Sequence, residues 1–139
     1  MNYTKTKQTA QTLQDIGVID WKEAIRQMND GDSDFYIGDF RFIADHAIDA
    51  IQQDELESDS YILGCFASWL LADVLGISTE SVEKIQQASP EALGEMVIAQ
   101  DKVAAVQYAY VSADGYGHHF AHYDGNEHCF DGYTAFRTN

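Results

Sequence analysis

The chain is 139 residues long, 45% hydrophobic and 12% aromatic, with one proline, so it fits one folded domain and is not a largely disordered chain. Its 23 acidic and 8 basic residues give a formal net charge of −15. Such a charge repels phosphate backbones and anionic membranes and attracts basic protein surfaces, which disfavours direct nucleic-acid binding and membrane association. The alternative is that the charge serves solubility alone, as in many acidic proteins.

The expected compartment follows from the N-terminus and the cysteines. The residues after Met1 do not form the apolar stretch of a secretory signal, so we expect a cytoplasmic protein. Cys65 and Cys129 lie far apart in segments of different character, which is typical of free thiols in a reducing compartment. We expect no cofactor.

Two helices are predicted at the start of the chain. Residues 1–19 have a weak helical pattern that Gly17 interrupts, so a short helix is expected there. Asp20 is followed three residues later by Glu23, the arrangement of an N-terminal capping box. This pair predicts a second helix over residues 21–28.

A strand segment and another helix follow. Residues 35–43 are aromatic and β-branched, which predicts one strand or two short strands bent at Gly38 and Asp39. Residues 45–56 place apolar side chains at helical spacing, with acidic and amide side chains on the opposite side. We therefore expect an amphipathic helix after the strands.

Residues 30–59 form an acidic region that we interpret as a partner-binding surface. Ten acidic residues stand there against Arg41 alone, a net charge of −9 in this stretch. A run of like charges is often just a solvated face, but solubility does not require the excess to be concentrated in one third of the chain. The predicted partner-binding residues are Asp30, Asp32, Asp34, Asp39, Asp45, Asp49, Asp54, Glu55, Glu57 and Asp59.

Residues 61–75 are the most apolar stretch of the chain and contain a single charge, Asp73. Their apolar side chains would go nearly all the way round a helix, which is typical of a helix packed on several sides. The stretch is too short to span a bilayer, which takes roughly twenty residues. We therefore expect a buried central helix over 61–75, around which the single domain is built.

Residues 71–85 resemble the helix-turn-helix family. Ala72, Gly76, Val82 and Ile85 have the spacing of its packing and turn positions. Recognition of DNA would require arginine or lysine on the second helix, whose outward charged residues are two acids and one base. We interpret the unit as helix packing without DNA binding, with a DNA-binding regulator as an alternative function.

The last part of the chain changes from helical to strand character. Ser89 and Pro90 are a helix start, and the helix is expected to continue to Tyr110. Turn signals at 124–126 and at 131–132 then predict two or three antiparallel strands, a C-terminal β-hairpin over 116–137. These strands would pair with residues 35–43 in one small sheet.

The C-terminal hairpin is also rich in histidine. If its turn lay at residues 124–126, His118, His122 and His128 would be candidate zinc ligands, an alternative that would make the chain a metal-binding or hydrolytic protein. The tail lacks the paired spacing of specific zinc motifs, and its register is not fixed by the sequence. We therefore expect the histidines to pack and hydrogen-bond on the sheet, and predict no metal site and no catalytic residue.

Three segments together carry a wider resemblance: FRFI at 40–43, the apolar stretch with GCF at 64–66, and GYGHHFAHYDGNEH at 115–128. With them the chain resembles small uncharacterised acidic proteins of phages and plasmids. This resemblance implies an anti-defence role, in which an acidic protein blocks restriction or CRISPR nucleases by presenting carboxylates in place of phosphates. It assigns no role to any individual residue.

The sequence thus predicts a mostly helical α+β single domain with a small antiparallel C-terminal sheet. We expect a protein-binding inhibitor of a host nucleic-acid-binding defence complex, acting as a nucleic-acid mimic, and not an enzyme. Its partner would be the basic surface of a nucleic-acid-binding protein, and its own contact with nucleic acid or membranes is not expected.

Overall fold

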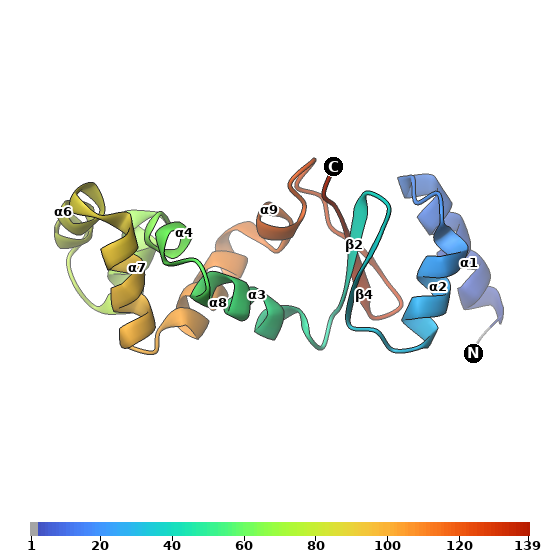
Figure 1. The fold of residues 1–139 in the computed structure, drawn as a ribbon, viewed down its shortest axis with the longest axis horizontal. Helices are drawn as coiled ribbons and strands as arrows, with labels where there is room; N and C mark the ends of the chain where they lie inside the picture. The colour runs from blue at the N-terminus through green and yellow to red at the C-terminus, as the bar shows by residue number, and fades with distance from the viewer. Residues whose placement is uncertain (1–2) are drawn as a thin grey trace. The chain divides into compact units, whose positions relative to one another are not determined.

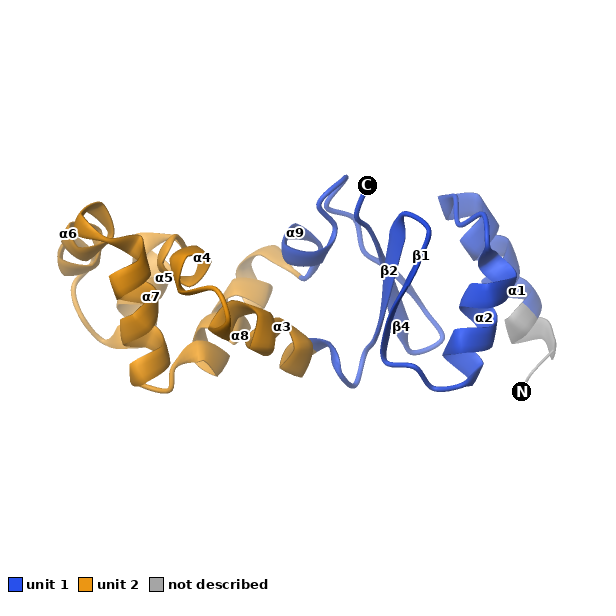
Figure 2. Cartoon of the chain, viewed as in Figure 1, with its two compact units in different colours: residues 1–48, 116–139 blue, residues 49–115 orange. Residues whose placement is uncertain are grey.

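The computed structural model describes residues 3–139 and confirms the α+β class (Figure 1). The chain forms two compact units (Figure 2). Unit 1 comprises residues 1–48 and 116–139, and unit 2 comprises residues 49–115. Each unit has its own apolar cluster, so the core is not organised around one segment. None of the described helices is long and apolar enough to cross a membrane.

Unit 1 begins with two helices, α1 (Tyr3–Ile16) and α2 (Trp21–Asn29). Gly17 adopts a φ of +100°, a conformation that favours glycine, and so ends α1 where the sequence predicted. The predicted capping box is wrong, because the Asp20 side chain makes no capping hydrogen bond. The Glu23 carboxylate accepts from Arg26 one turn later instead.

The sheet of unit 1 has four antiparallel strands in the order β1-β2-β4-β3. The N-terminal and C-terminal strands pair through β2 and β4, as the sequence predicted. In Figure 1, α1 and α2 lie on one side of this sheet and the short helix α9 on the other. The strands are β1 (Asp34–Ile37), β2 (Phe40–Ala44), β3 (His128–Phe130) and β4 (Tyr133–Arg137).

Of the two predicted C-terminal turns, the second joins strands. Asp131 and Gly132 have φ values of 52° and 79°, as a tight type I′ hairpin turn between β3 and β4 requires. The hairpin predicted around 124–126 is wrong, because the residues before it form helix α9 (Gly117–Phe120) and a loop. A Cβ atom on Gly117 would lie 2.0 Å from the Gly125 carbonyl oxygen, so glycine allows this loop to pack against α9.

Aromatic side chains make the core of unit 1. The rings of Phe35 and Phe42 stack with centroids 5.0 Å apart, and Tyr133 meets Phe35 edge-on. The Tyr133 hydroxyl donates to the backbone carbonyl of Asp32 at 2.6 Å. The acidic loop before β1 is therefore attached to β4 through its backbone, which leaves its carboxylates exposed.

Unit 2 is entirely helical in the described chain. Its buried core includes Leu63, Leu71, Val82, Leu93 and Val97. Its helices are α3 (Ile48–Glu57), α4 (Ser60–Gly64), α5 (Ser68–Leu75), α6 (Thr79–Ala88), α7 (Pro90–Ala99) and α8 (Val103–Asp114).

The predicted central helix over 61–75 is wrong in detail, because the segment is divided into α4 and α5. The Gln86 side-chain amide donates to the carbonyls of Gly64 and Phe66, at 3.0 and 2.7 Å, so backbone groups freed at the break are satisfied. The segment is also not buried all round, because Trp69 is 61% exposed. Apolar composition correctly marked the core but not the break.

Helices α4 and α7 cross in direct backbone contact. A Cβ atom on Gly64 would lie 1.7 Å from the Pro90 carbonyl oxygen, and one on Gly94 would lie 1.8 Å from the Ser60 carbonyl oxygen. Real Cβ atoms do not approach backbone so closely. Only glycine at both positions therefore permits this crossing, which is why Gly94 stands in the middle of a helix despite its low helix propensity.

Two further helix boundaries test the sequence prediction. The helix predicted from Pro90 to Tyr110 is two helices, since Asp101 adopts a φ of 56° between α7 and α8. Its start is confirmed, with the Ser89 hydroxyl accepting from the Ala92 amide. The turn between α5 and α6 has Gly76 in the left-handed conformation, as a helix C-terminus favours.

Substitution of Gly94 tests the helix crossing. We expect Gly94→Ala to lower the free energy of unfolding by about 3 kcal/mol, because the added methyl group forces two backbones apart. Urea unfolding followed by circular dichroism measures this change. The matched control is Glu95→Ala on the exposed side of the same helix, which should change stability by less than about 0.5 kcal/mol. Equal effects of the two substitutions would contradict the crossing.

Tyr110 gives unit 2 a sensitivity to alkaline pH. Burial, aided by the nearby Asp114 carboxylate, raises the pKa of Tyr110 to about 12. Because the folded state holds the neutral phenol, this contribution to stability is complete below pH 10 and is lost as the pH rises from 10 to 12.

We therefore expect Tyr110→Phe to flatten the decline in stability between pH 10 and 12, measured by urea unfolding at several pH values. Tyr133, whose pKa is raised mainly by burial, should supply a remaining part of the decline. Tyr108→Phe, at a side chain that is 75% exposed, serves as control and should leave the profile as in the wild type. An unaltered profile in Tyr110→Phe would show that this phenol does not couple to folding.

Candidate protein-binding surface

The structure divides the ten predicted partner-binding acids between the two units. Asp30, Asp32, Asp34, Asp39 and Asp45 belong to unit 1, and the five from Asp49 to Asp59 belong to unit 2. Nine of the ten are exposed, and Glu55 is half-buried. The set is therefore a group of surface carboxylates, but it is not gathered within one compact unit.

Asp34 is committed to the fold by an ion pair with Arg41. The Arg41 guanidinium donates to both carboxylate oxygens, at 2.9 and 2.8 Å, from the facing strand of the β1–β2 hairpin. The Arg41 side chain is only 12% exposed and also lies 5.1 Å from the ring centroid of Phe120. The single base within the acidic region thus neutralises one particular carboxylate.

Other predicted acids also serve the structure. Asp30 pairs with Arg26 at 2.7 Å. The Asp45 carboxylate accepts from the Thr134 hydroxyl at 3.0 Å, and that of Asp59 accepts from the Ile62 amide and caps α4. The fold thus holds these three carboxylates in place, and an opposite charge offsets that of Asp30.

Asp49 belongs to a polar network between α3 and α8. The Gln107 side-chain amide donates to Asp49 and to Gln52, both at 2.9 Å, and Gln53 donates to Gln107 at 3.1 Å. Gln52 is fully buried. This network fixes the register of the two helices, and it gives the Asp49 carboxylate a structural role.

Arg26 illustrates how the bases of unit 1 are used. Its guanidinium contacts the carboxylates of Glu23 and Asp30 on the same helix face. The hydrogen bond from Arg26 holds the pKa of the Glu23 carboxyl at about 2. Both arginines of the first half of the chain, Arg26 and Arg41, are therefore in ion pairs and offer little charge to a partner.

Unit 2 carries most of the net charge, whereas the sequence prediction placed the excess in residues 30–59. Its 67 residues include twelve acids and two lysines, a net of −10, against −5 for unit 1. Lys84 lies 3.5 Å from Glu80. Asp54 and Glu57 on α3 are joined by exposed acids from later helices: Asp73, Glu80, Glu83, Glu91 and Glu95.

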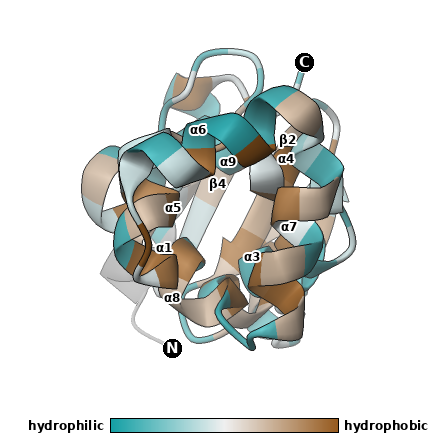
Figure 3. Ribbon diagram, turned by 90° about the vertical axis from the view of Figure 1, so that its left-hand side faces the viewer, coloured by the Kyte–Doolittle hydropathy of each residue, from teal (hydrophilic) through white to brown (hydrophobic). Residues whose placement is uncertain are grey.

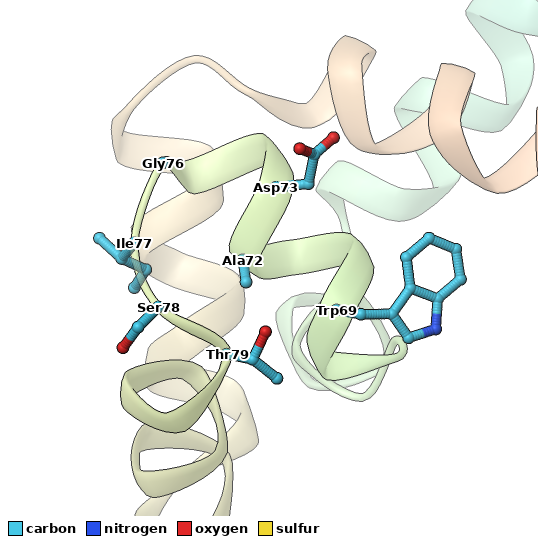
Figure 4. A pocket seen from close by; sticks show the side chains of 7 residues that line it. All are labelled: Trp69, Ala72, Asp73, Gly76, Ile77, Ser78 and Thr79. Carbon is cyan, nitrogen blue, oxygen red and sulfur yellow. The ribbon is translucent and has the colours of Figure 1, made fainter.

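Two hollows on the surface of unit 2 share Trp69 and Asp73. One, of about 560 Å³, lies between α5 and α8 and is also lined by Tyr108. The other, of about 380 Å³, lies at the turn from α5 to α6 (Figure 4). Trp69 and Tyr108 are 61% and 75% exposed. Sequence reasoning placed Trp69 in the buried core, and its spacing from Asp73, one turn away, was the signal for an outward face.

The histidine-rich tail does not form the ligand arrangement of the alternative zinc hypothesis. His118 lies on α9, His122 lies in the following loop and His128 lies on β3, where it pairs with Ala135. Within residues 3–139, no group of three or more His, Cys, Asp and Glu side chains is placed to hold a metal ion. The alternative zinc site built on a cross-strand hairpin is therefore wrong in its geometry.

The helix-turn-helix-like unit presents an acidic second helix. Figure 3 shows hydrophilic residues along most of α6. Its described outward charges are Glu80, Glu83 and Lys84, and the lysine is paired with Glu80. The net charge of these three residues is −1, which disfavours contact with DNA phosphates.

Comparisons with known proteins give no information on the function of this chain. No family model, no curated protein and no solved structure matches the chain. The exposed carboxylates of unit 2 and the apolar hollow between α5 and α8 are the two surface features with a distinct chemistry. Exposed charge and exposed apolar surface are the features through which proteins commonly associate.

The division between structural and available carboxylates is testable in unit 1 and unit 2. We expect Asp34→Asn to lower the free energy of unfolding by about 1 to 3 kcal/mol, because it leaves the largely buried Arg41 without its charged partner. Asp54→Asn, at an exposed site on α3, is the matched control and should change stability by less than about 0.5 kcal/mol. Urea unfolding measures both changes. An Asp34→Asn variant with the same free energy of unfolding as the wild type would refute the structural role of Asp34.

Proposed function

We propose that the chain is an acidic protein-binding inhibitor that occupies the basic nucleic-acid-binding surface of a partner and so acts as a nucleic-acid mimic. The observation that supports this most directly is the net charge of −10 on unit 2, which has two lysines among its 67 residues. A partner surface that binds phosphates is basic, and it would attract this unit for the same electrostatic reason.

The helical build of unit 2 suits such a role. Exposed acids lie on α3, α5, α6 and α7, which pack on one core, so their carboxylates are carried on ordered backbone. A fixed array loses less conformational entropy on binding than a flexible acidic tail would. The net charge would also steer encounter with a basic surface, and the rate of association would fall as salt screens the field.

The proposed partner class is a nucleic-acid-binding complex of host defence. The resemblance to small acidic proteins of phages and plasmids motivates this part of the proposal, with restriction and CRISPR nucleases as the class to examine first. Such nucleases hold nucleic acid in positively charged channels, which are the surfaces that a mimic would occupy.

Charge-removing and charge-keeping variants test the proposal. A nuclease captured by the tagged chain at low salt is purified and its DNA binding is measured with the chain as competitor. We expect the variant Asp54→Asn/Glu57→Gln/Glu91→Gln/Glu95→Gln to compete at least about tenfold less well than the wild type, because the attraction to the basic surface is reduced.

The matched control exchanges the same positions for the other acid, as Asp54→Glu/Glu57→Asp/Glu91→Asp/Glu95→Asp. It keeps the net charge and should retain competition within about threefold of the wild type. Circular dichroism confirms that both variants are folded. Undiminished competition by the amide variant would reject the mimicry mechanism.

A further inference from the structure

The hollow between α5 and α8 has an apolar character that the acidic surface does not explain. Val74, Ala105 and Ala109 line it, with the rings of Trp69 and Tyr108. Trp69 and Tyr108 are among the large hydrophobic side chains that the fold leaves exposed, at 61% and 75%. Tryptophan and tyrosine are the residues most enriched where protein partners bind strongly.

This hollow, which we call the groove between α5 and α8, has room for an inserted side chain. Alanines at 105 and 109 stand one helical turn apart on α8, and their small side chains leave space beside the larger rings. A volume of about 560 Å³ admits several apolar side-chain groups of a partner. Burying such groups there would remove apolar surface from water on both molecules.

The charge around the groove selects the kind of occupant. Asp73 lines both hollows and is exposed, and unit 2 as a whole has a net charge of −10. A second copy of the chain would bring a further charge of −15, and anionic membranes would also be repelled. A cationic segment gains from this field, and its lysine or arginine can also stack on an aromatic ring.

We propose that the groove between α5 and α8 binds a basic amphipathic segment of a partner protein. An apolar side chain of that segment would insert between Trp69 and Tyr108, and a lysine or arginine beside it would face Asp73. The inference rests on the proposed function in taking the partner to be basic, and it adds an apolar anchor that supplies specificity beyond charge.

Tryptophan fluorescence tests the groove directly. The chain contains two tryptophans, so Trp21→Phe leaves Trp69 as the sole reporter. The probes are three synthetic peptides of equal length: one of lysine and leucine, one with every leucine replaced by serine, and one with every lysine replaced by glutamine.

We expect the lysine–leucine peptide to shift the Trp69 emission to shorter wavelength and to bind more weakly as salt rises. Each of the other two peptides should bind at least about tenfold more weakly, because one lacks the anchor and the other lacks the charge. Equal binding of the lysine–serine peptide would overturn the anchor. A concentration-dependent shift without peptide would identify a second copy as the occupant and would also overturn the inference.

Substitutions then locate the site. Tyr108→Ala and Asp73→Asn change exposed side chains that line the groove. Each should lower the affinity for the lysine–leucine peptide by about fivefold or more. Tyr61→Ala removes another exposed aromatic ring of unit 2, one outside the groove, and should bind as the wild type does. Unchanged binding by Tyr108→Ala would refute this site.

The outcome separates this inference from the proposed function. The four-amide variant is Asp54→Asn/Glu57→Gln/Glu91→Gln/Glu95→Gln. If Tyr108→Ala binds the lysine–leucine peptide normally while the four-amide variant no longer competes with DNA, the proposed groove site is rejected and the mimicry mechanism remains. If the four-amide variant competes with DNA normally while Tyr108→Ala no longer binds the lysine–leucine peptide, the groove is a binding site and the mimicry mechanism is rejected.

Discussion

The direct backbone contact of α4 and α7 is the constraint on which unit 2 depends. Gly64 and Gly94 allow each helix to approach the carbonyl oxygens of the other, a distance that any side chain would prevent. Helix α4 ends at Gly64, within this contact, and α5 begins at Ser68. Trp69 follows at the start of α5 with an exposed side chain, so the apolar groove is lined by a helix that begins just after this crossing.

The sequence predicted the elements that depend on local chemistry. Pro90 after a capping Ser89 marked the start of α7, and Gly132 after Asp131 marked the turn between β3 and β4. Each of these signals works through the backbone of a few neighbouring residues. The α+β class and the pairing of early with late strands also followed, because the apolar and aromatic patterns of the segments agree with their final burial.

What the sequence did not predict depends on contacts between distant residues. The break before α5 is satisfied by Gln86, twenty residues away from Phe66, and no local pattern reveals that bond. The loop at 124–126 has the composition of a hairpin turn, but its packing against Gly117 decides otherwise. The extent of the acidic surface was not predicted either. The acidic region of the sequence ends at residue 59, whereas folding brings further exposed acids on α5, α6 and α7 into the same unit. Trp69 has the same apolar sequence neighbours as the buried Leu70 and Leu71, and only its spacing of one helical turn from Asp73 marks it as outward-facing.

The central claim is that the acidic chain and nucleic acid occupy the same surface of a partner. The most direct measurement is sedimentation of a captured nuclease mixed with labelled DNA and the labelled chain. The concentrations of DNA and chain are set near their dissociation constants for the nuclease. The account predicts two binary complexes that replace each other as the ratio of chain to DNA changes, with no species that carries both labels. A stable ternary complex would contradict it, because a mimic cannot be bound where its nucleic acid is already seated.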